Sequence, residues 1–179
     1  MLHAGFGSGA ASAQQQDCPE PQSWQYEGVD TSFQRERRFA GLSTSMRSHG
    51  RVRVDDGTVL WETLAPIEMV LRIDRDGLAQ SVAGGPLEAV AGGPRGNAEP
   101  ARLITALLSG DMASATEHFA IEQRQDPSSG HWHVVLQPSD DGLAGVVQRI
   151  EMTGCEHIEM VVIDQPNGDQ DRVVFGAAD

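Results

Sequence analysis

The side chains that could do chemistry in this sequence are few, and most of them are histidines. His131 and His133 are two residues apart in a stretch that alternates like a β-strand, and Cys155 and His157 have the same spacing. Residues two apart on a strand share a face, so either pair permits metal ligation. The sequence places no carboxylate to support them, and we expect solvated side chains and no metal site.

The sequence lacks the common motifs of covalent and phosphate chemistry. It contains no Gly-x-Ser-x-Gly, no Gly-x-x-x-x-Gly-Lys and no His-Glu-x-x-His. The acidic pairs Asp55-Asp56 and Asp140-Asp141 fall at predicted turns, where aspartate is favoured for conformational reasons and is seldom buried. We therefore predict a protein that is not an enzyme, with no catalytic residues and no cofactor.

The composition restricts the possible partners. A chain of 179 residues is predicted to form one domain, large enough for a core or a lined cavity. Its net charge of −13 argues against nucleic acid and anionic membrane surfaces as direct partners. No apolar run approaches the roughly 20 residues of a membrane-spanning helix. Aromatic residues make up only 5% of the chain, which favours aliphatic contacts over stacking.

The stretch 47–80 is the clearest part of the predicted sheet. Val52 and Val54 alternate with arginines, which is typical of a half-buried strand. The Asp-Asp-Gly sequence at 55–57 predicts a hairpin turn, because Asp and Gly tolerate the positive φ of tight turns. The next strand is predicted over 58–64.

Similar alternation recurs along the chain. Short strands with one helical insert predict a mainly β (α+β) fold, a large curved antiparallel sheet or half-open β-barrel covered by short lid helices. A strong hairpin signal, Pro166-Asn167-Gly168-Asp169, separates the last two strands. The predicted strands are 31–39, 51–54, 58–64, 68–74, 117–125, 131–138, 146–153, 158–164 and 171–175.

The segment 84–117 breaks the strand pattern. Two Gly-Gly-Pro sequences flank one apolar helical turn, Pro100 and Gly110 bound a second helix, and a third is predicted over 111–117. Short apolar helices on glycine hinges suit a movable lid over a cavity, and the alternative is a fixed helix that seals an ordinary core. The predicted lid residues are Leu87, Leu103, Ile104, Leu107 and Leu108.

Residues 1–23 are predicted to lie outside the domain, which would occupy 24–179. Ala11-Ser12-Ala13 has the small-x-small form of a signal-peptidase site. The ten residues before it are too few and too rich in glycine for a full apolar region. The segment is therefore interpreted as a signal-peptide remnant or a flexible tail.

Cys18 and Cys155 are the only two cysteines. In an exported chain two cysteines commonly pair, and this disulfide would attach the N-terminal segment to the far end of the sheet. The alternative is two unpaired thiols in a cytosolic protein. Neither cysteine has a neighbouring base, so a structural role is expected.

Several arginines gather in the first strands of this acidic protein. We interpret them as the solvated face of a two-stranded ribbon rather than as an anion site. They are Arg35, Arg37, Arg38, Arg47, Arg51 and Arg53.

The order and spacing of these features resemble the LolA family of outer-membrane lipoprotein carriers, in particular a divergent branch of it. No single motif is specific, but together they span residues 31–175. The matching elements are Phe33, Ser48-His49-Gly50, Trp61 with Pro66, Asp76-Gly77, the segment 103–108, His118-Phe-Ala-Ile-Glu122, Leu136-Gln-Pro138 and residues 158–168.

The resemblance implies a periplasmic half-barrel, in a Gram-negative bacterium, with a helical lid over an apolar cavity. It implies transport or chaperoning of a lipoprotein acyl chain or another lipidic molecule, moved towards the outer membrane between membrane-bound donor and acceptor proteins. Two departures matter. Phe33-Gln34-Arg35 stands where the family has Phe-x-Gln in the first strand. Asp55-Asp56 stands where the family has Arg-Pro, whose arginine latches the lid, so the latch and the cargo are not carried over.

The physical requirement for such a carrier is an apolar sleeve, because an exposed acyl chain costs about 0.8 kcal/mol per methylene in water. The concave side of the predicted sheet would supply it. The same side chains could instead interdigitate into a filled core, since alternation does not distinguish the two. The predicted lining is Phe33, Trp61, Met69, Leu71, Ile73, Trp132, Val134, Leu136, Ile158 and Met160.

Three functions follow from this reading. The first is a carrier, expected to be monomeric, for a lipid or lipoprotein cargo. The second is an enzyme or assembly factor acting on a hydrophobic polyketide or aryl-polyene-type molecule. The third is a lipid-sensing regulator that binds a membrane protein through its acidic surface.

Overall fold

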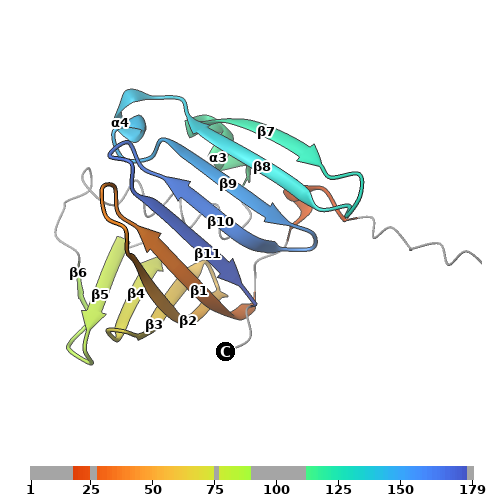
Figure 1. Ribbon diagram of the computed structural model, residues 1–179. Helices are drawn as coiled ribbons and strands as arrows, with labels where there is room; N and C mark the ends of the chain where they lie inside the picture. The colour runs from red at the N-terminus through yellow and green to blue at the C-terminus, as the bar shows by residue number, and fades with distance from the viewer. Residues whose placement is uncertain (1–17, 25–27, 75–76, 90–111, 177–179) are drawn as a thin grey trace, which may run out of the picture.

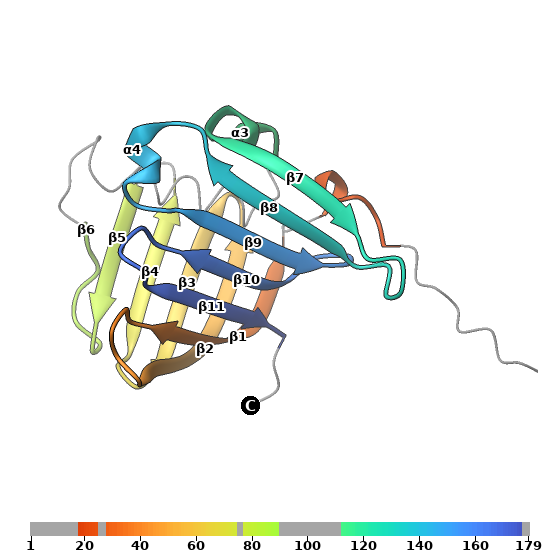
Figure 2. The ribbon, with the colours of Figure 1, turned by 45° about the horizontal axis from the view of Figure 1, so that its top comes forward.

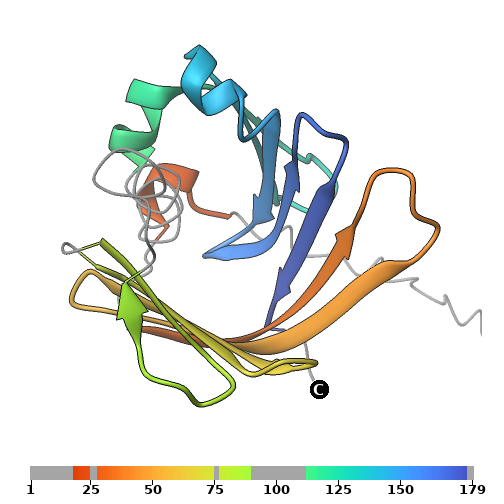
Figure 3. The same ribbon diagram turned by 90° about the vertical axis from the view of Figure 1, so that its left-hand side faces the viewer.

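An eleven-stranded antiparallel sheet dominates the computed structural model of this protein, and it curves strongly around one face (Figures 1 and 3). The structure describes residues 18–24, 28–74, 77–89 and 112–176. Within them the strands are β1 Val29–Arg38, β2 Ser45–Asp55, β3 Thr58–Ala65, β4 Met69–Asp74, β5 Gly77–Val82, β6 Glu88–Ala89, β7 Phe119–Gln125, β8 Trp132–Pro138, β9 Arg149–Gly154, β10 Ile158–Asp164 and β11 Gln170–Phe175. The helices there are η1 Pro21–Ser23, α3 Met112–His118 and α4 Asp141–Ala144.

Two meanders make up this sheet (Figure 2). The strand order is β6-β5-β4-β3-β2-β1-β11-β10-β9-β8-β7, so each strand pairs with its neighbour in sequence except at the centre. There β1 pairs with β11 and joins the two halves. The edges, β6 and β7, do not pair with each other, and the sheet is not closed. The predicted fold class is confirmed.

Strand register divides the side chains between two faces. Phe33 lies opposite both Gly50 and Phe175, and Trp61 lies opposite both Val52 and Leu71. We call the face that carries these residues the inner face. The concave side holds η1, α3 and α4 (Figure 3), and Trp24, Ala115 and Leu143 pack there against inner-face residues of β7–β10.

The hairpin turns agree with the sequence prediction. Asp56 and Gly57 have φ of 47° and 69°, so both central residues of the β2–β3 turn are left-handed, as a two-residue hairpin requires. The helix predicted over 111–117 is also present, as α3.

The single basic patch predicted from the sequence is wrong. Arg35 and Arg37 share the inner face with Phe33, because residues two apart on a strand point the same way. The other four, Arg38, Arg47, Arg51 and Arg53, lie on the outer face.

Two further predictions differ from the structure. The helical turn expected at Leu87 is wrong, because the next residues form β6, a two-residue strand paired with β5. Leu87 itself is exposed. The other predicted lid residues, Leu103, Ile104, Leu107 and Leu108, lie outside the described residues.

Helix α4 was read from the sequence only as a turn. The side chain of Asp140 accepts a hydrogen bond of 2.8 Å from the backbone N–H of Leu143, which is an N-terminal cap. Leu143 is thereby directed into the core. The acidic pair at 140–141 therefore starts a short helix, for the same conformational reason that aspartate favours turns.

Candidate functional site

The half of the sheet formed by β7–β11 is filled. Trp24, Ala115 of α3 and Leu143 of α4 form one buried cluster with the inner-face residues of the strands. Val134 and Leu136 at its centre are fully buried. For these two residues the structure matches the filled-core alternative of the sequence analysis. Trp132 packs against the same cluster.

The other half carries a second, smaller cluster. Val52, Val54, Val59 and Ile73 are its buried members, and Trp61, Leu71 and Leu78 are half-buried around it. Phe33 is also buried. Its ring lies 4.3 Å from that of Trp61, and Trp61 in turn meets Phe175 edge-on at 6.0 Å. An aromatic row thus crosses from β3 to β11.

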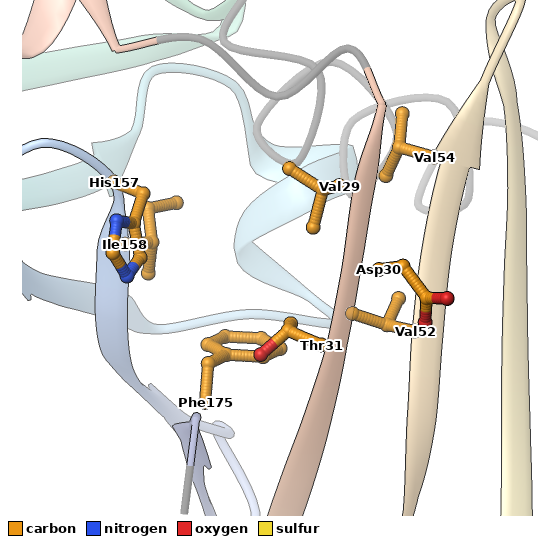
Figure 4. Close-up of a pocket in the computed structure, with 8 residues that line it drawn as sticks. All are labelled: Val29, Asp30, Thr31, Val52, Val54, His157, Ile158 and Phe175. Atoms are coloured by element: carbon orange, nitrogen blue, oxygen red, sulfur yellow. The ribbon is translucent and has the colours of Figure 1, made fainter.

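An apolar pocket of about 290 Å³ lies between the two clusters. Figure 4 shows Val29 on one side of it, across a gap from Ile158 and Phe175 on the other. Val29 and Phe175 pack against both clusters, so the pocket marks the junction of the two halves. The described residues that line it are Val29, Asp30, Thr31, Val52, Val54, His157, Ile158 and Phe175.

The pocket rim is polar but carries no arginine among its described lining residues. The Asp30 carboxylate accepts a hydrogen bond from Arg51 at 2.8 Å, with both side chains about half exposed. Thr31 contributes a hydroxyl and His157 an exposed imidazole. Hydroxyl and imidazole groups both donate and accept hydrogen bonds.

A disulfide holds one wall of the pocket. Cys18 and Cys155 are joined, with their Cα atoms 4.8 Å apart, and Cys155 lies just before the pocket residues His157 and Ile158. The indole N–H of Trp132 donates to the carbonyl oxygen of Cys18 at 3.3 Å.

The segment that begins at Cys18 is part of the packed structure. Pro21 and Trp24 are buried, and Trp24 belongs to the larger core cluster. The domain boundary predicted at residue 24 falls inside this segment. The disulfide and the buried tryptophan together fix the segment to the sheet.

Glycine at position 50 is required by close packing. A Cβ there would overlap the carbonyl oxygen of Glu62 and lie 3.0 Å from the ring of Phe33. The β2–β3 register shifts at this point, between His49 and Gly50. Gly50 therefore lets the ring of Phe33 sit close to the sheet and contact Trp61.

Near the β1–β2 hairpin the inner face carries charged residues instead of apolar ones. Arg35 donates to Asp171 at 2.7 Å, and Arg37 lies 3.3 Å from Asp169. Asp169 also accepts the backbone N–H of Ala40 at 2.9 Å. This N–H and the Arg37 guanidinium lower the pKa of Asp169, although partial desolvation opposes them.

The predicted lining residues do not all lie on the same face of the sheet. Phe33 and Ile73 are buried and Trp61, Met69 and Leu71 half-buried, all on the inner face. Ile158 lines the pocket. Met160 is the exception. It lies opposite Val174, which lies opposite Gln34, so it is on the outer face. A register shift between Ile158 and Met160 breaks the simple alternation that the prediction assumed.

Of the eight described lining residues only Ile158 was among those predicted, and the apolar ones that were missed are Val29, Val52, Val54 and Phe175. The alternation of Val52 and Val54 with arginines was visible in the sequence, and it indicated the correct face. What the sequence did not show was that β11 pairs with β1, which brings Phe175 opposite Phe33.

His131, just before β8, and His133, within it, each have one acidic neighbour. His131 lies 3.2 Å from Glu159 and His133 lies 3.1 Å from Glu151. The expectation of no carboxylate support is therefore wrong. No group of three potential ligands occurs among the residues that the structure describes. A second pocket of about 360 Å³ adjoins both histidines and Arg124.

Among the solved structures that are similar to this chain are two proteins of low sequence identity. One is a LolA superfamily protein, NE2245 from Nitrosomonas europaea, with 6% identity, 88% of each chain covered and a TM-score of 0.47. The other is a DUF1329 family protein from Desulfovibrio piger, with 8% identity, 82% of each chain covered and a TM-score of 0.38. At these sequence identities and TM-scores the similarity supports no conclusion about function.

No family model and no curated protein matches the sequence. Within the described ranges, no helix has the length and apolar character needed to cross a bilayer.

Proposed function

We propose that this protein is a periplasmic carrier or chaperone that binds a lipoprotein acyl chain or another lipidic molecule and moves it towards the outer membrane. The observation that carries the proposal is the apolar pocket at the junction of the two half-sheets. Five of its eight described lining residues are aliphatic or aromatic, contributed by Val29, Val52, Val54, Ile158 and Phe175.

The gain from such a pocket is large enough for transport. Burial of a methylene group stabilises a complex by about 0.8 kcal/mol, so a chain of about eight methylenes gains about 6 kcal/mol before the costs of association. Those costs are several kcal/mol, which leaves a reversible complex. Reversibility is what a carrier needs, because the cargo must also be released.

The disulfide supports the proposed location. Disulfides persist in oxidising compartments such as the bacterial periplasm and are rare in the cytosol. Cys18 and Cys155 are bonded and Cys18 is buried. Residues 11–13, with their small-x-small form, agree with an exported chain.

The experiment that tests the proposal is binding of N-phenyl-1-naphthylamine, an uncharged fluorescent probe, together with native mass spectrometry of freshly isolated protein. We expect saturable probe binding and a co-purified lipidic mass. A Val29→Glu variant places a carboxylate at the pocket wall and is expected to weaken probe binding by about tenfold or more, because the buried charge opposes an apolar ligand.

The matched control is Val70→Glu. Val70 is also a half-buried strand valine, but it lies opposite Glu62 and Ser81 on the outer face. This variant is expected to bind the probe like the parent protein. No lipid mass together with no probe binding by the parent would refute carriage, and equal loss in both variants would refute this pocket as the site.

A further inference from the structure

We propose that the pocket selects a ligand with one unbranched acyl chain and an uncharged polar end, such as a monoacylglycerol or an N-acyl amide. This inference rests on the proposed function, because it names the class of molecule that the same pocket would carry. Two independent observations support it, the size of the pocket and the kind of polar groups at its rim.

The size of the pocket favours one chain over two. About 290 Å³ holds about ten groups the size of a water molecule, at about 30 Å³ each, and a methylene group is of similar size. Two chains of eight or more carbons would need about twice that volume.

The surroundings of the pocket also oppose widening. Val59 on one side, and Val134 and Leu136 on the other, have no exposed surface and sit within filled clusters. The sheet is continuously paired beneath the pocket, from β2 through β1 to β11. Packed interiors of this kind resist the insertion of extra volume.

The rim favours an uncharged end group. Asp30 is the acidic residue among the described lining residues, and no arginine is among them. The side chains of Asp30 and Arg51 pair with each other on the outer face, so neither charge points into the pocket. A carboxylate or phosphate at the mouth of the pocket would therefore find no arginine or lysine among the described lining residues to pair with. The net charge of −13 adds a weaker, salt-screened repulsion.

The remaining rim groups suit a hydroxyl or an amide. The Thr31 hydroxyl and the His157 imidazole can each donate or accept a hydrogen bond, and Figure 4 shows both side chains at the pocket. A glycerol or amide end group offers matching donors and acceptors. The pocket thus combines an apolar wall sized for one chain with a polar, uncharged mouth.

The test is competition for bound N-phenyl-1-naphthylamine at pH 7.5 by three ligands with the same chain length. They are 1-monooctanoylglycerol, octanoic acid and 1,2-dioctanoylglycerol. We expect the monoacylglycerol to displace half of the probe at a concentration about tenfold lower than either of the others.

A charge variant separates the role of the rim from that of the chain. His157→Lys places a cation at the exposed rim and is expected to lower the preference for monooctanoylglycerol over octanoic acid by about threefold, as for an exposed ion pair. The control is His49→Lys, at an exposed residue of the outer face opposite Gln34, and it is expected to leave the preference unchanged.

Each outcome has a distinct meaning. Equal displacement by octanoic acid would overturn the uncharged end group, and equal displacement by dioctanoylglycerol would overturn the single chain. Equal changes of ligand preference in the His157→Lys and His49→Lys variants would show that the rim does not discriminate between end groups. Failure of the probe to bind at all would refute the proposed function itself.

Discussion

Gly50 shows how one residue controls the apolar surface at the centre of the sheet. The ring of Phe33 occupies the space over Gly50 and contacts Trp61 from there. The aromatic row continues to Phe175, which lines the pocket. A larger residue at position 50 would push on both the β3 backbone and the ring.

We expect Gly50→Ala to lower the free energy of unfolding by about 1–3 kcal/mol, because its Cβ overlaps the Glu62 carbonyl oxygen and the neighbouring strand must shift. Urea denaturation followed by tryptophan fluorescence measures the change. Ser48→Ala, two residues along the same strand face, is the control and is expected to change stability by less than about 0.5 kcal/mol. Equal effects would contradict the packing argument.

At the scale of elements, two hairpins are tied together by one carboxylate. Asp169, in the β10–β11 turn, accepts the backbone N–H of Ala40 in the β1–β2 loop and pairs with Arg37. Both contacts favour the charged form of Asp169 and lower its pKa, with the Ala40 hydrogen bond as the larger cause. The tie therefore depends on pH.

Because the folded-state pKa of Asp169 is lower than its unfolded value of about 3.9, the carboxylate stabilises the fold fully above that value. This stabilisation is lost as pH falls through the lower, folded-state pKa. We expect Asp169→Asn to be less stable than the parent at pH 7. The difference should shrink as the pH falls from about 4 towards 2, measured by urea denaturation across that range. A difference that stays constant with pH would contradict this role.

Elements that depend on local sequence could be predicted, whereas features that depend on pairing between distant strands could not. The β2–β3 hairpin follows from local alternation and an Asp-Gly turn, and it was predicted correctly. Met160 was placed on the wrong face because a register shift within β10 is set by pairing with β9. Arg35 and Arg37 were misassigned because inner-face arginines are uncommon, and their buried partners, Asp169 and Asp171, are more than 130 residues away.

The pocket itself could be predicted only in part. Alternation identifies which side chains share a face, and it gave the correct face for Trp61, Leu71 and Ile73. It does not say what covers that face. The cover over β7–β10 comes from Trp24, Ala115 and Leu143, which lie in three separate segments with no strand periodicity. The division into a filled half and a pocket therefore required the three-dimensional structure.

At the scale of the whole molecule, the disulfide connects distant parts of the chain. Cys18 and Cys155 are 137 residues apart in sequence, and the bond fixes the N-terminal segment beside the turn that carries His157. In the chain-entropy model, closing so long a loop restricts the unfolded state strongly.

We expect Cys18→Ser together with Cys155→Ser to lower the free energy of unfolding by about 2–5 kcal/mol. Urea denaturation of the variant against the disulfide-bonded parent measures this loss, and the reduced parent is the control expected to match the variant. Binding of the naphthylamine probe should weaken as well, since a pocket wall loses its attachment. An unchanged midpoint of unfolding would show that the bond contributes little.

The pairing of β1 with β11 has a consequence for the order in which the molecule is built. Each meander consists of neighbouring strands and needs only local contacts, whereas the seam between them joins the first strand of the sheet to the last. The pocket straddles this seam, with Val29 from one side and Phe175 from the other. A nascent chain that has not yet supplied β11 therefore lacks one wall of the pocket, and the pocket is complete only once β11 has been synthesised and has paired with β1.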